Sequence, residues 1–478
     1  MTHPRLSRKD PAAPVGIVHL GPGAFFRAFN AVYTADAMAR DGGDWGICAV
    51  SLRSPDARDE LDPQGGVYTA VSLGPDGPAP RVISSVSEVL VAPEYPAAVL
   101  ARMTAPATKI VSLTITEKGY CHNPATGRLR LEHPDILHDL AHPAHPRSAP
   151  GFLVEALDRR RQTGTAPFTV LSCDNLPSNG PLARGVVLAF AQARDPEIAD
   201  WIAQQVKFPA TMVDRITPAT TPEDIERLAA LTGFHDPACV WHEPFRQWVI
   251  EDNFTDNARP GWDAGGAQFV RDVSAFETMK LRCLNGTHSA LAYLGYLAGY
   301  ETVSDTVSDP AFAALCQKLW RDEILPTVPQ PEGEDLTAYT DALLTRYRNP
   351  AIRHRTWQIA MDGSQKLPQR ILGPVAENLA AERPVPGLAL VVAAWMRYVG
   401  GVDEAGQSID VRDPLADHLR AVSDGVDDPA SKVAALLAVD QVFAPALAAN
   451  PAFREAVTRA YLGLCQYGAA ASVAGYIA

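Results

Sequence analysis

Residues 15–27 read VGIVHLGPGAFFR and contain the clearest fold signal of the chain. The apolar run at 15–20 is typical of a buried first strand, and Gly21 and Gly23 follow it directly. A Gly-x-Gly pair after a strand lets the backbone turn tightly and approach a pyrophosphate, while the next helix supplies free N–H groups. The stretch therefore predicts the phosphate loop of a Rossmann-like, dinucleotide-binding domain.

The loop departs from the full G-x-G-x-x-G pattern, because Phe26 stands where the third glycine is expected. Phe25 and Arg27 complete the predicted cofactor-binding set with the two glycines, and Arg27 adds a cation for a phosphate. A glycine turn without a ligand is the simpler alternative.

The second predicted strand, residues 46–52, bears on which dinucleotide is bound. An acidic residue at the end of this strand usually holds the ribose of NAD. Here the strand ends in Ser51-Leu52-Arg53, and Asp56 follows. We expect NAD, with NADP as the alternative, because an arginine at this place is suited to a 2′-phosphate.

Strand and helix patterns alternate through the first half of the chain. Strands are predicted at 15–20, 46–52, 109–116, 168–173 and 211–216, and helices at 30–40 and 150–162. This alternation predicts a mostly parallel sheet covered on both faces.

Longer helical patterns begin at about residue 274. They cover residues 275–299, 309–325, 336–347, 387–398 and 433–442. The predicted fold class is α/β, with a Rossmann-like N-terminal domain (residues 1–262) and a mostly α-helical C-terminal domain (residues 263–478). The boundary is placed within PGWDAGG, residues 260–266.

Composition limits the classes of partner. A chain of 478 residues is long enough for two domains, and its net charge of -13 disfavours nucleic acid and anionic membranes. The seven cysteines are scattered without a C-x-x-C pair, which predicts neither a metal site nor disulfides. The N-terminus lacks an apolar signal core, so we expect a cytoplasmic protein with no membrane partner.

Residues 276–289, FETMKLRCLNGTHS, carry the strongest catalytic pattern. On an α-helix, Lys280, Asn285 and His288 fall within an arc of about 140°. Apolar neighbours of Lys280 favour a lowered lysine pKa, as a general base requires. Asn285 and His288 are suited to hold and polarise a substrate oxygen. A buried hydrogen-bonded trio that only braces the structure is the alternative.

The K-x-x-x-x-N-x-x-H pattern closely resembles the signature of the mannitol dehydrogenase family, the polyol-specific long-chain dehydrogenases. Further matching stretches run in order along the chain: HLGPGAFFRAF (19–29), SLTITEKGY (112–120), SCDNLPSNG (172–180), FPATMVDRITP (208–218), EPFRQWVIEDNF (243–254) and WMRYVGGVDEAG (395–406).

The resemblance implies a role for each of these residues. Lys280 is the general acid/base, and Asn285 and His288 bind the reacting oxygen. Asn175 and Asp214 help to bind the substrate chain, and Glu117 lies near the lysine and relays its proton. Taken alone, the last three have plainer interpretations: a helix cap, a surface acid and a solvated strand end.

The segment 353–370, RHRTWQIAMDGSQKLPQR, bears on the substrate. In the mannitol 2-dehydrogenase branch a substrate-binding arginine falls eight residues before the motif lysine. Gln358 takes that place here, whereas Lys366 is retained. The segment instead resembles the branch that acts on D-mannonate and D-fructuronate. The substrate carboxylate needs a cation, and Lys366, Arg353, Arg355 and Arg370 are available.

The resemblance thus implies an NAD(P)-dependent, metal-independent oxidoreductase that interconverts D-mannonate and D-fructuronate in hexuronate breakdown. A mannitol- or arabinitol-type polyol 2-dehydrogenase is the alternative. Its partner is a small sugar acid or polyol, and the resemblance favours a monomer or simple homodimer. A short-chain dehydrogenase would need Tyr-x-x-x-Lys, and none of the 13 tyrosines has a lysine four residues later. A sensor that kept only the fold would have no need of the lysine base.

Overall fold

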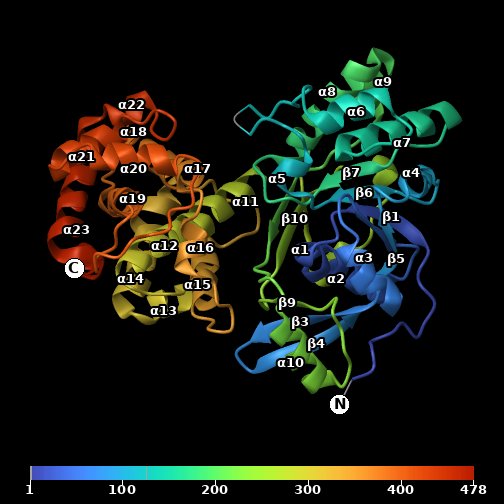
Figure 1. Ribbon diagram of the computed structural model, residues 1–478, viewed down its shortest axis with the longest axis horizontal. Helices are drawn as coiled ribbons and strands as arrows, with labels where there is room; N and C mark the ends of the chain where they lie inside the picture. The colour runs from blue at the N-terminus through green and yellow to red at the C-terminus, as the bar shows by residue number, and fades with distance from the viewer. Residues whose placement is uncertain (1–2, 125) are drawn as a thin grey trace. The chain divides into compact units, whose positions relative to one another are not determined.

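The computed structural model describes residues 3–124 and 126–478. The chain divides into two compact units, Met1–Ser274 and Ala275–Ala478, and each is described by itself (Figure 1). The sequence pattern places the division after residue 262. The segment that follows contains strand β11 (Gln268–Val270), which pairs with a strand of the first unit.

A five-stranded parallel sheet forms the centre of the first unit, in the order β5-β2-β1-β6-β7. Its strands are β1 (Val15–Leu20), β2 (Gly46–Ser51), β5 (Val86–Val91), β6 (Ile110–Leu113) and β7 (Thr169–Ser172). The chain runs outward from β1 to β5 and then returns to β6 on the other side. The point where the order reverses therefore lies between β1 and β6, where ligands of such sheets bind.

Both faces of this sheet are buried, as the apolar strands predict. Val18 and Leu20 of β1 pack with Phe152 of helix α7 (Ala149–Thr163) on one face, and Ile17 packs with Tyr33 of α2 (Asn30–Asp41) on the other. Figure 1 shows α7 on one side of the strands and α2 on the other. The Rossmann-like prediction is confirmed.

Two smaller sheets complete the first unit. In one, β8 (Thr211–Asp214) runs antiparallel to β10 (Gln247–Glu251), which is parallel to β11. The other has the order β4-β3-β9, from β3 (Tyr68–Gly74), β4 (Gly77–Ile83) and β9 (Val240–His242). The strand predicted at 211–216 exists, but it lies outside the parallel sheet.

The other helices of this unit are α1 (Ala24–Ala28), α3 (Asp56–Leu61), α4 (Pro96–Thr104), α5 (Thr116–Gly119), α6 (Pro134–Ala141), α8 (Asn179–Arg194), α9 (Pro196–Gln205) and α10 (Pro222–Thr232).

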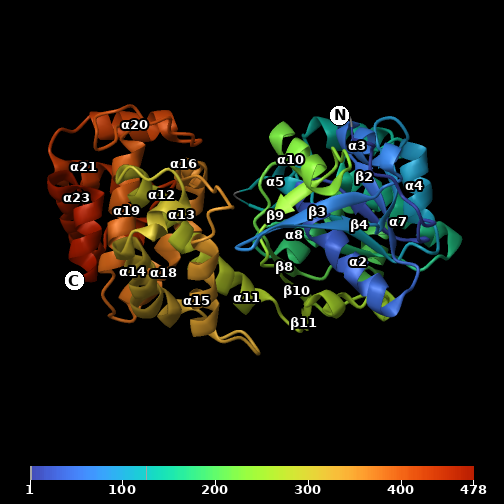
Figure 2. The same cartoon turned by 90° about the horizontal axis from the view of Figure 1, so that it is seen from below.

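The second unit is helical. Its central helix, α19 (Pro386–Val399), is buried on nearly every side and packs against α12 (Thr287–Leu297) and α23 (Pro451–Ile477). Figure 2 shows α19 between these two helices. A helix that is apolar all round is expected at the centre of a helical domain.

The remaining helices are α11 (Ser274–Met279), α13 (Val303–Ser308), α14 (Pro310–Leu319), α15 (Leu336–Tyr347), α16 (Thr356–Ala360), α17 (Gly363–Leu367), α18 (Gly373–Ala380), α20 (Ala416–Asp424), α21 (Pro429–Leu437) and α22 (Pro445–Ala448). The helix predicted at 433–442 thus ends at Leu437.

Segments of π-helix interrupt the long helices that the sequence predicts. Where one helix is expected over 275–299, the chain forms α11, the π-helix η4 (Lys280–Gly286) and then α12. The predicted helix at 309–325 likewise passes from α14 into the π-helix η5 (Trp320–Ile324). Apolar spacing alone does not distinguish these turns from α-helix, because the π-turn adds only one residue.

Within the described ranges, no helix is both long and apolar enough to cross a membrane. All seven cysteines are free thiols, and Cys465 is exposed while the other six are buried.

Candidate active site

The predicted phosphate loop is a tight turn at the carboxyl end of β1. Gly21 has a φ of +97°, and its N–H donates to the carbonyl of Val50 at 2.9 Å. A Cβ atom at Gly21 would lie 2.2 Å from the carbonyl oxygen of Thr114, so only glycine fits there. The turn is thereby held against the ends of β2 and β6.

A cavity of about 550 Å³ opens beside this turn. Loops after β1, β2 and β6 line it, with Gly21, Gly23, Arg27, Arg53 and Thr116 among the lining residues. A Cβ atom at Gly23 would meet no described atom within 4 Å, so bare backbone faces open space. Such a wall fits a pyrophosphate, which needs close backbone approach.

Arg27 lines the cavity but is already engaged within the protein. Its Nη1 lies 2.9 Å from Glu60 and donates to the carbonyl of Ala238 at 2.9 Å. Phe25 is partly buried and stacks on Phe29, with ring centroids 4.9 Å apart. The cofactor roles of these two residues stay predictions.

His19 explains why Phe26 can replace the third glycine of the loop. The two rings stack with centroids 3.8 Å apart, so an aromatic pair joins strand to helix where glycine usually permits close packing. His19 Nδ1 is 2.8 Å from Ser112 Oγ, and burial lowers the pKa of the imidazole to about 3. The sequence pattern gave no sign of this buried support beneath the loop.

The end of β2 presents hydroxyl groups and an arginine to the cavity. Ser51 Oγ donates to the carbonyl of Ser54 at 2.5 Å, and Ser54 Oγ donates to Asp56 at 2.8 Å. Arg53 is exposed. The cavity therefore offers oxygens suited to a ribose, and Arg53 and Arg147 line it in addition to Arg27.

Asp174 fixes the loops that carry Glu117 and Asn175. Its carboxylate accepts from the N–H groups of Ile115 at 3.1 Å and Thr116 at 2.8 Å, and from Tyr120 Oη at 2.8 Å. Burial raises the pKa of this carboxyl. The residue joins the carboxyl ends of β6 and β7, and sequence reasoning did not single it out.

Glu117 and Asn175 are both exposed at this edge of the parallel sheet, whereas Asp214 is buried at the end of β8. Burial of Asp214 rules out a surface acid, the plainer interpretation that the sequence allowed for it. The substrate-binding and proton-relay roles of the three residues stay predictions.

Lys280, Asn285 and His288 lie on one continuous helical run in the second unit. Lys280 begins η4, and His288 lies in α12. The i→i+5 hydrogen bonding of a π-helix brings residue i+5 nearly above residue i, so Asn285 aligns with Lys280 better than an α-helix allows. Lys280 and His288 are each only 7% exposed.

His288 is an uncharged imidazole. Burial, followed by the neighbouring groups His354, Arg346, Arg370 and Lys280, holds its pKa well below the usual value. Its ring lies 4.8 Å from that of Tyr347 and 5.3 Å from that of His354. At neutral pH it therefore offers one N–H donor and one lone pair.

The four cations of the segment 353–370 differ in exposure and in their distance from the catalytic pattern. Arg353 and Arg355 are exposed, with Glu301 4.0 Å and 3.6 Å away. Arg370 is close to the catalytic pattern, because its Nη1 donates to the carbonyl of Asn285 at 3.5 Å and to Ser289 Oγ at 3.3 Å. Arg370 follows Lys366 by four residues, and this helical spacing was the sequence feature that could have identified Arg370 as a neighbour of the site.

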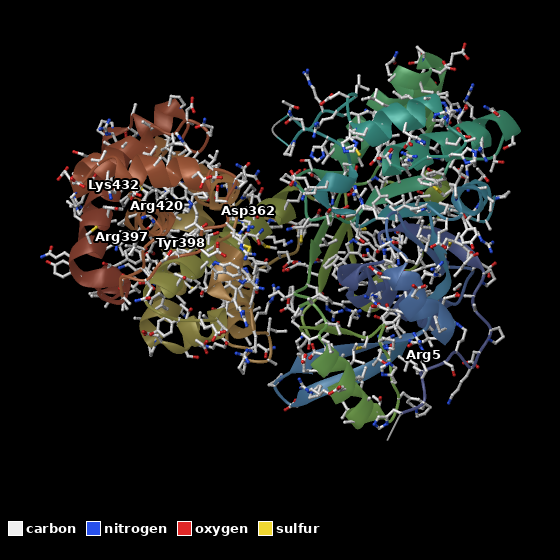
Figure 3. All side chains as sticks on the ribbon, viewed as in Figure 1. Arg5, Asp362, Arg397, Tyr398, Arg420 and Lys432 are labelled. Carbon is white, nitrogen blue, oxygen red and sulfur yellow. The ribbon has the colours of Figure 1, made fainter. Side chains whose placement is uncertain are left out.

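Lys366 is partly buried beside Arg370. Its Nζ donates to the carbonyl of Met361 at 2.6 Å and lies 4.0 Å from Asp362, which Figure 3 labels in the helical unit. Burial, and then the charge of Arg370, lowers the pKa of this lysine. Gln358 is exposed on α16. The substrate-binding roles of Gln358 and Lys366 stay predictions.

In the part of the chain that the structure describes, no three or more His, Cys, Asp or Glu side chains are grouped as a metal site would need.

Comparisons with known proteins agree with this architecture. The model of the mannitol dehydrogenase Rossmann domain matches residues 15–264, and that of the mannitol dehydrogenase C-terminal domain matches residues 272–465. The chain is 51% identical to D-mannonate oxidoreductase of Escherichia coli (strain K12), over 96% of this chain and 95% of that protein.

The similarity extends to mannitol 2-dehydrogenases. The enzyme of Aspergillus terreus is 41% identical over 98% of this chain and 94% of its own length. A solved structure of Pseudomonas fluorescens mannitol 2-dehydrogenase, a ternary complex with NAD and D-mannitol, superposes with a TM-score of 0.84. It is 41% identical and covers 97% of this chain and 94% of that one.

Proposed function

The chain belongs to the mannitol dehydrogenase family of oxidoreductases, and we propose that it interconverts D-mannonate and D-fructuronate with NAD as cofactor. The observation that carries this proposal is the helical run of buried Lys280, partly buried Asn285 and buried, uncharged His288, with Arg370 beside Asn285 and Lys366 close to Arg370. A base, two oxygen ligands and positive charge are the groups that oxidation of a sugar acid requires.

The cavity at Gly21 and Gly23 is the proposed cofactor site. The positive φ of Gly21 and the open space in front of Gly23 fit a dinucleotide pyrophosphate. When bound, NAD accepts the hydride in oxidation and NADH returns it in reduction. Ser51 and Asp56 are suited to the ribose, and Arg53 is the residue that would admit NADP instead.

The proton steps belong to Lys280. In oxidation its neutral amine removes the proton of the reacting hydroxyl, and in reduction its ammonium returns that proton to the new hydroxyl. Asn285 and the N–H of neutral His288 donate to the same oxygen and stabilise the negative charge that develops on it. Asn175 and Asp214 hold the substrate chain, and Glu117 relays the proton of Lys280.

A sugar acid is favoured over an uncharged polyol by two observations. The 51% identity to D-mannonate oxidoreductase exceeds the 41% identity to the mannitol 2-dehydrogenases. Partly buried Arg370 also places a positive charge beside Asn285, which a polyol does not need. We expect the enzyme to work in the cytoplasm, where free thiols are stable.

A polyol 2-dehydrogenase is the second candidate function. It is favoured by the likeness to the Pseudomonas fluorescens enzyme, whose structure contains NAD and D-mannitol. On this interpretation Gln358 would be a neutral replacement of the arginine expected there.

Initial rates of NADH oxidation with D-fructuronate and with D-fructose, each repeated with NADPH, test the proposal. We expect kcat/KM to be at least about tenfold higher for fructuronate, which is 1.4 kcal/mol of transition-state discrimination. A preference for fructose would select the polyol candidate. Failure to oxidise NADH or NADPH with either ketone would contradict both.

A further inference from the structure

Arg370 is a partly buried guanidinium that has no carboxylate partner among the described residues. Among the described residues it makes two long hydrogen bonds, both from Nη1, to the carbonyl of Asn285 and to Ser289 Oγ. Burial lowers the pKa of Arg370, and the groups that oppose this effect are the phenols of Tyr293 and Tyr347 rather than an acid. Taking a cation even partly out of water without a counter-ion is costly, so an arrangement of this kind points to an anion from outside the chain.

Arg160 shows how this protein satisfies a buried arginine that has only a structural role. Its guanidinium donates to four carbonyl groups: Met103 at 2.9 Å, Ala166 at 2.6 Å, Ala105 at 2.6 Å and Thr108 at 2.7 Å. All three of its nitrogens are used. Arg370 uses only Nη1, and its bonds of 3.3 Å and 3.5 Å are near the limit of a hydrogen bond.

Arg370 lies beside the two residues that are proposed to bind the reacting oxygen. It contacts the backbone of Asn285, whose side chain is a proposed ligand of that oxygen, and its charge acts on His288, the other ligand. In a hexonate the carboxylate lies four bonds from the carbon that is oxidised. A cation for it must therefore lie beside the oxygen ligands and not on a distant surface.

The geometry points to Arg370 as the specificity-determining residue that binds the carboxylate of the sugar-acid substrate through Nε and Nη2. This inference rests on the proposed function and deepens it. A bidentate arginine–carboxylate pair would use Nε and Nη2, the two nitrogens that make no hydrogen bond to the described residues. Arg353 and Arg355 are exposed beside Glu301, and Lys366 is engaged by Met361, so none of the three matches Arg370.

The test compares three variants with the wild type: Arg370→Gln, Arg370→Lys and, as a control from the same segment, Arg355→Gln. Steady-state kinetics with NADH are measured for D-fructuronate and for D-fructose. Calorimetry measures the affinity of the NADH-loaded protein for D-mannonate and for D-mannitol.

We expect Arg370→Gln to raise the KM for fructuronate about 100-fold and to weaken mannonate binding by a similar factor. Its effect on fructose and mannitol should be many times smaller, and Arg370→Lys should restore part of the acid affinity. Arg355→Gln should leave both substrates within about twofold, because its side chain is exposed.

Equal losses for acid and polyol would overturn the inference, since Arg370 would then act only through Asn285 and His288. Unchanged mannonate affinity in Arg370→Gln would overturn it too. If the wild type failed to reduce fructuronate, the proposed function would be wrong. The calorimetric difference between mannonate and mannitol would still decide whether Arg370 binds the carboxylate.

Discussion

Lys280 and His288 are both buried, but the proposed reaction needs a proton carrier from the first and a hydrogen-bond donor from the second. His288 is kept uncharged by burial and by the cations around it, so it is a hydrogen-bond donor that does not compete for the proton. In the proposed mechanism Lys280 is then the one group of the catalytic pattern that carries the proton between states. This division of roles makes the lysine the residue whose loss should cost the most turnover.

Replacing Lys280 with alanine should lower kcat by at least about 100-fold in both directions, because the proton step loses its acid/base. NADH binding should stay within about twofold, since the proposed cofactor residues belong to the other unit. Stopped-flow rates and a fluorescence titration measure the two effects. Lys207→Ala, at an exposed lysine, is the control, and near-normal turnover of Lys280→Ala would rule out the base assignment.

Replacing Gly23 with leucine should weaken NADH binding at least about tenfold, because the side chain would fill the space in front of the loop. Folding should be unaffected, since a Cβ at Gly23 meets no described atom within 4 Å and its φ of -71° suits any residue. Gly185→Leu, at an exposed glycine of α8, is the matched control. Equal NADH affinities of the two variants would show that this loop does not bind the cofactor.

At the scale of elements, η4 shows how far residue spacing predicts the site. The pattern K-x-x-x-x-N-x-x-H correctly places three side chains on one helical run, but an α-helix would leave Lys280 and Asn285 well apart in direction. The π-turn corrects this. Its extra residue per turn cannot be read from apolar spacing, because Met279, Cys283 and Leu284 are buried in either geometry.

Glu323 shows a structural use of a buried charge in the same unit. Its carboxylate accepts from the N–H groups of Gly387 at 2.7 Å and Leu388 at 2.8 Å, at the start of α19, and from Tyr476 Oη at 2.8 Å. Negative charge is favourable at a helix N-terminus. One side chain thereby joins η5, the central helix α19 and the C-terminal helix α23.

Glu323→Ala should lower the free energy of unfolding by about 3 kcal/mol, because two buried N–H groups lose their acceptor. Urea unfolding followed by circular dichroism measures the change. Asp322→Ala is the neighbouring control, since Asp322 pairs with Arg321 at an exposed position and should cost less than about 0.5 kcal/mol. Similar losses of unfolding free energy in the two variants would show that Glu323 does not stabilise the start of α19.

At the scale of the whole molecule, the two-part organisation and the fold class follow from the sequence. Strands β1 and β2 and the helices α2, α7 and α15 lie within one residue of their predicted limits, because each is a clear apolar pattern between turn residues. Strand β4 was not predicted, because its sequence GPAPRVI contains two prolines and its largely exposed residues form no apolar pattern. The pairing of Asp174 with Ile115 and Thr116 depends on tertiary contacts, which spacing does not reveal.

Buried histidines make the stability of the whole protein depend on pH. Burial lowers the pKa of His19 and of His242 to about 3 and that of His354 to about 4, and His288 is also lowered. Below about pH 6.5 the unfolded chain binds protons that the folded chain does not, so stability is lost as the pH falls. Each histidine should contribute about 1 kcal/mol of loss between pH 8 and 5.5.

The raised pKa values of Asp174 and Glu323 act in the opposite direction, but they are fewer. Urea midpoints at pH 8 and pH 5.5 should therefore fall with acidification. His242→Gln should reduce this fall, whereas His235→Gln, at an exposed histidine, should not. A midpoint that rises on acidification would show that the carboxyl groups dominate.

Product analysis distinguishes hydride transfer to the ketone carbon of a sugar acid, the proposed activity, from every alternative raised above. The enzyme is incubated with D-fructuronate and NADH deuterated at the transferred position, and the product is examined by mass spectrometry and NMR. We expect D-mannonate with one deuterium at the former ketone carbon, and little such product from Lys280→Ala. Unchanged fructuronate, with mannitol formed readily from fructose under the same conditions, would contradict the proposed activity.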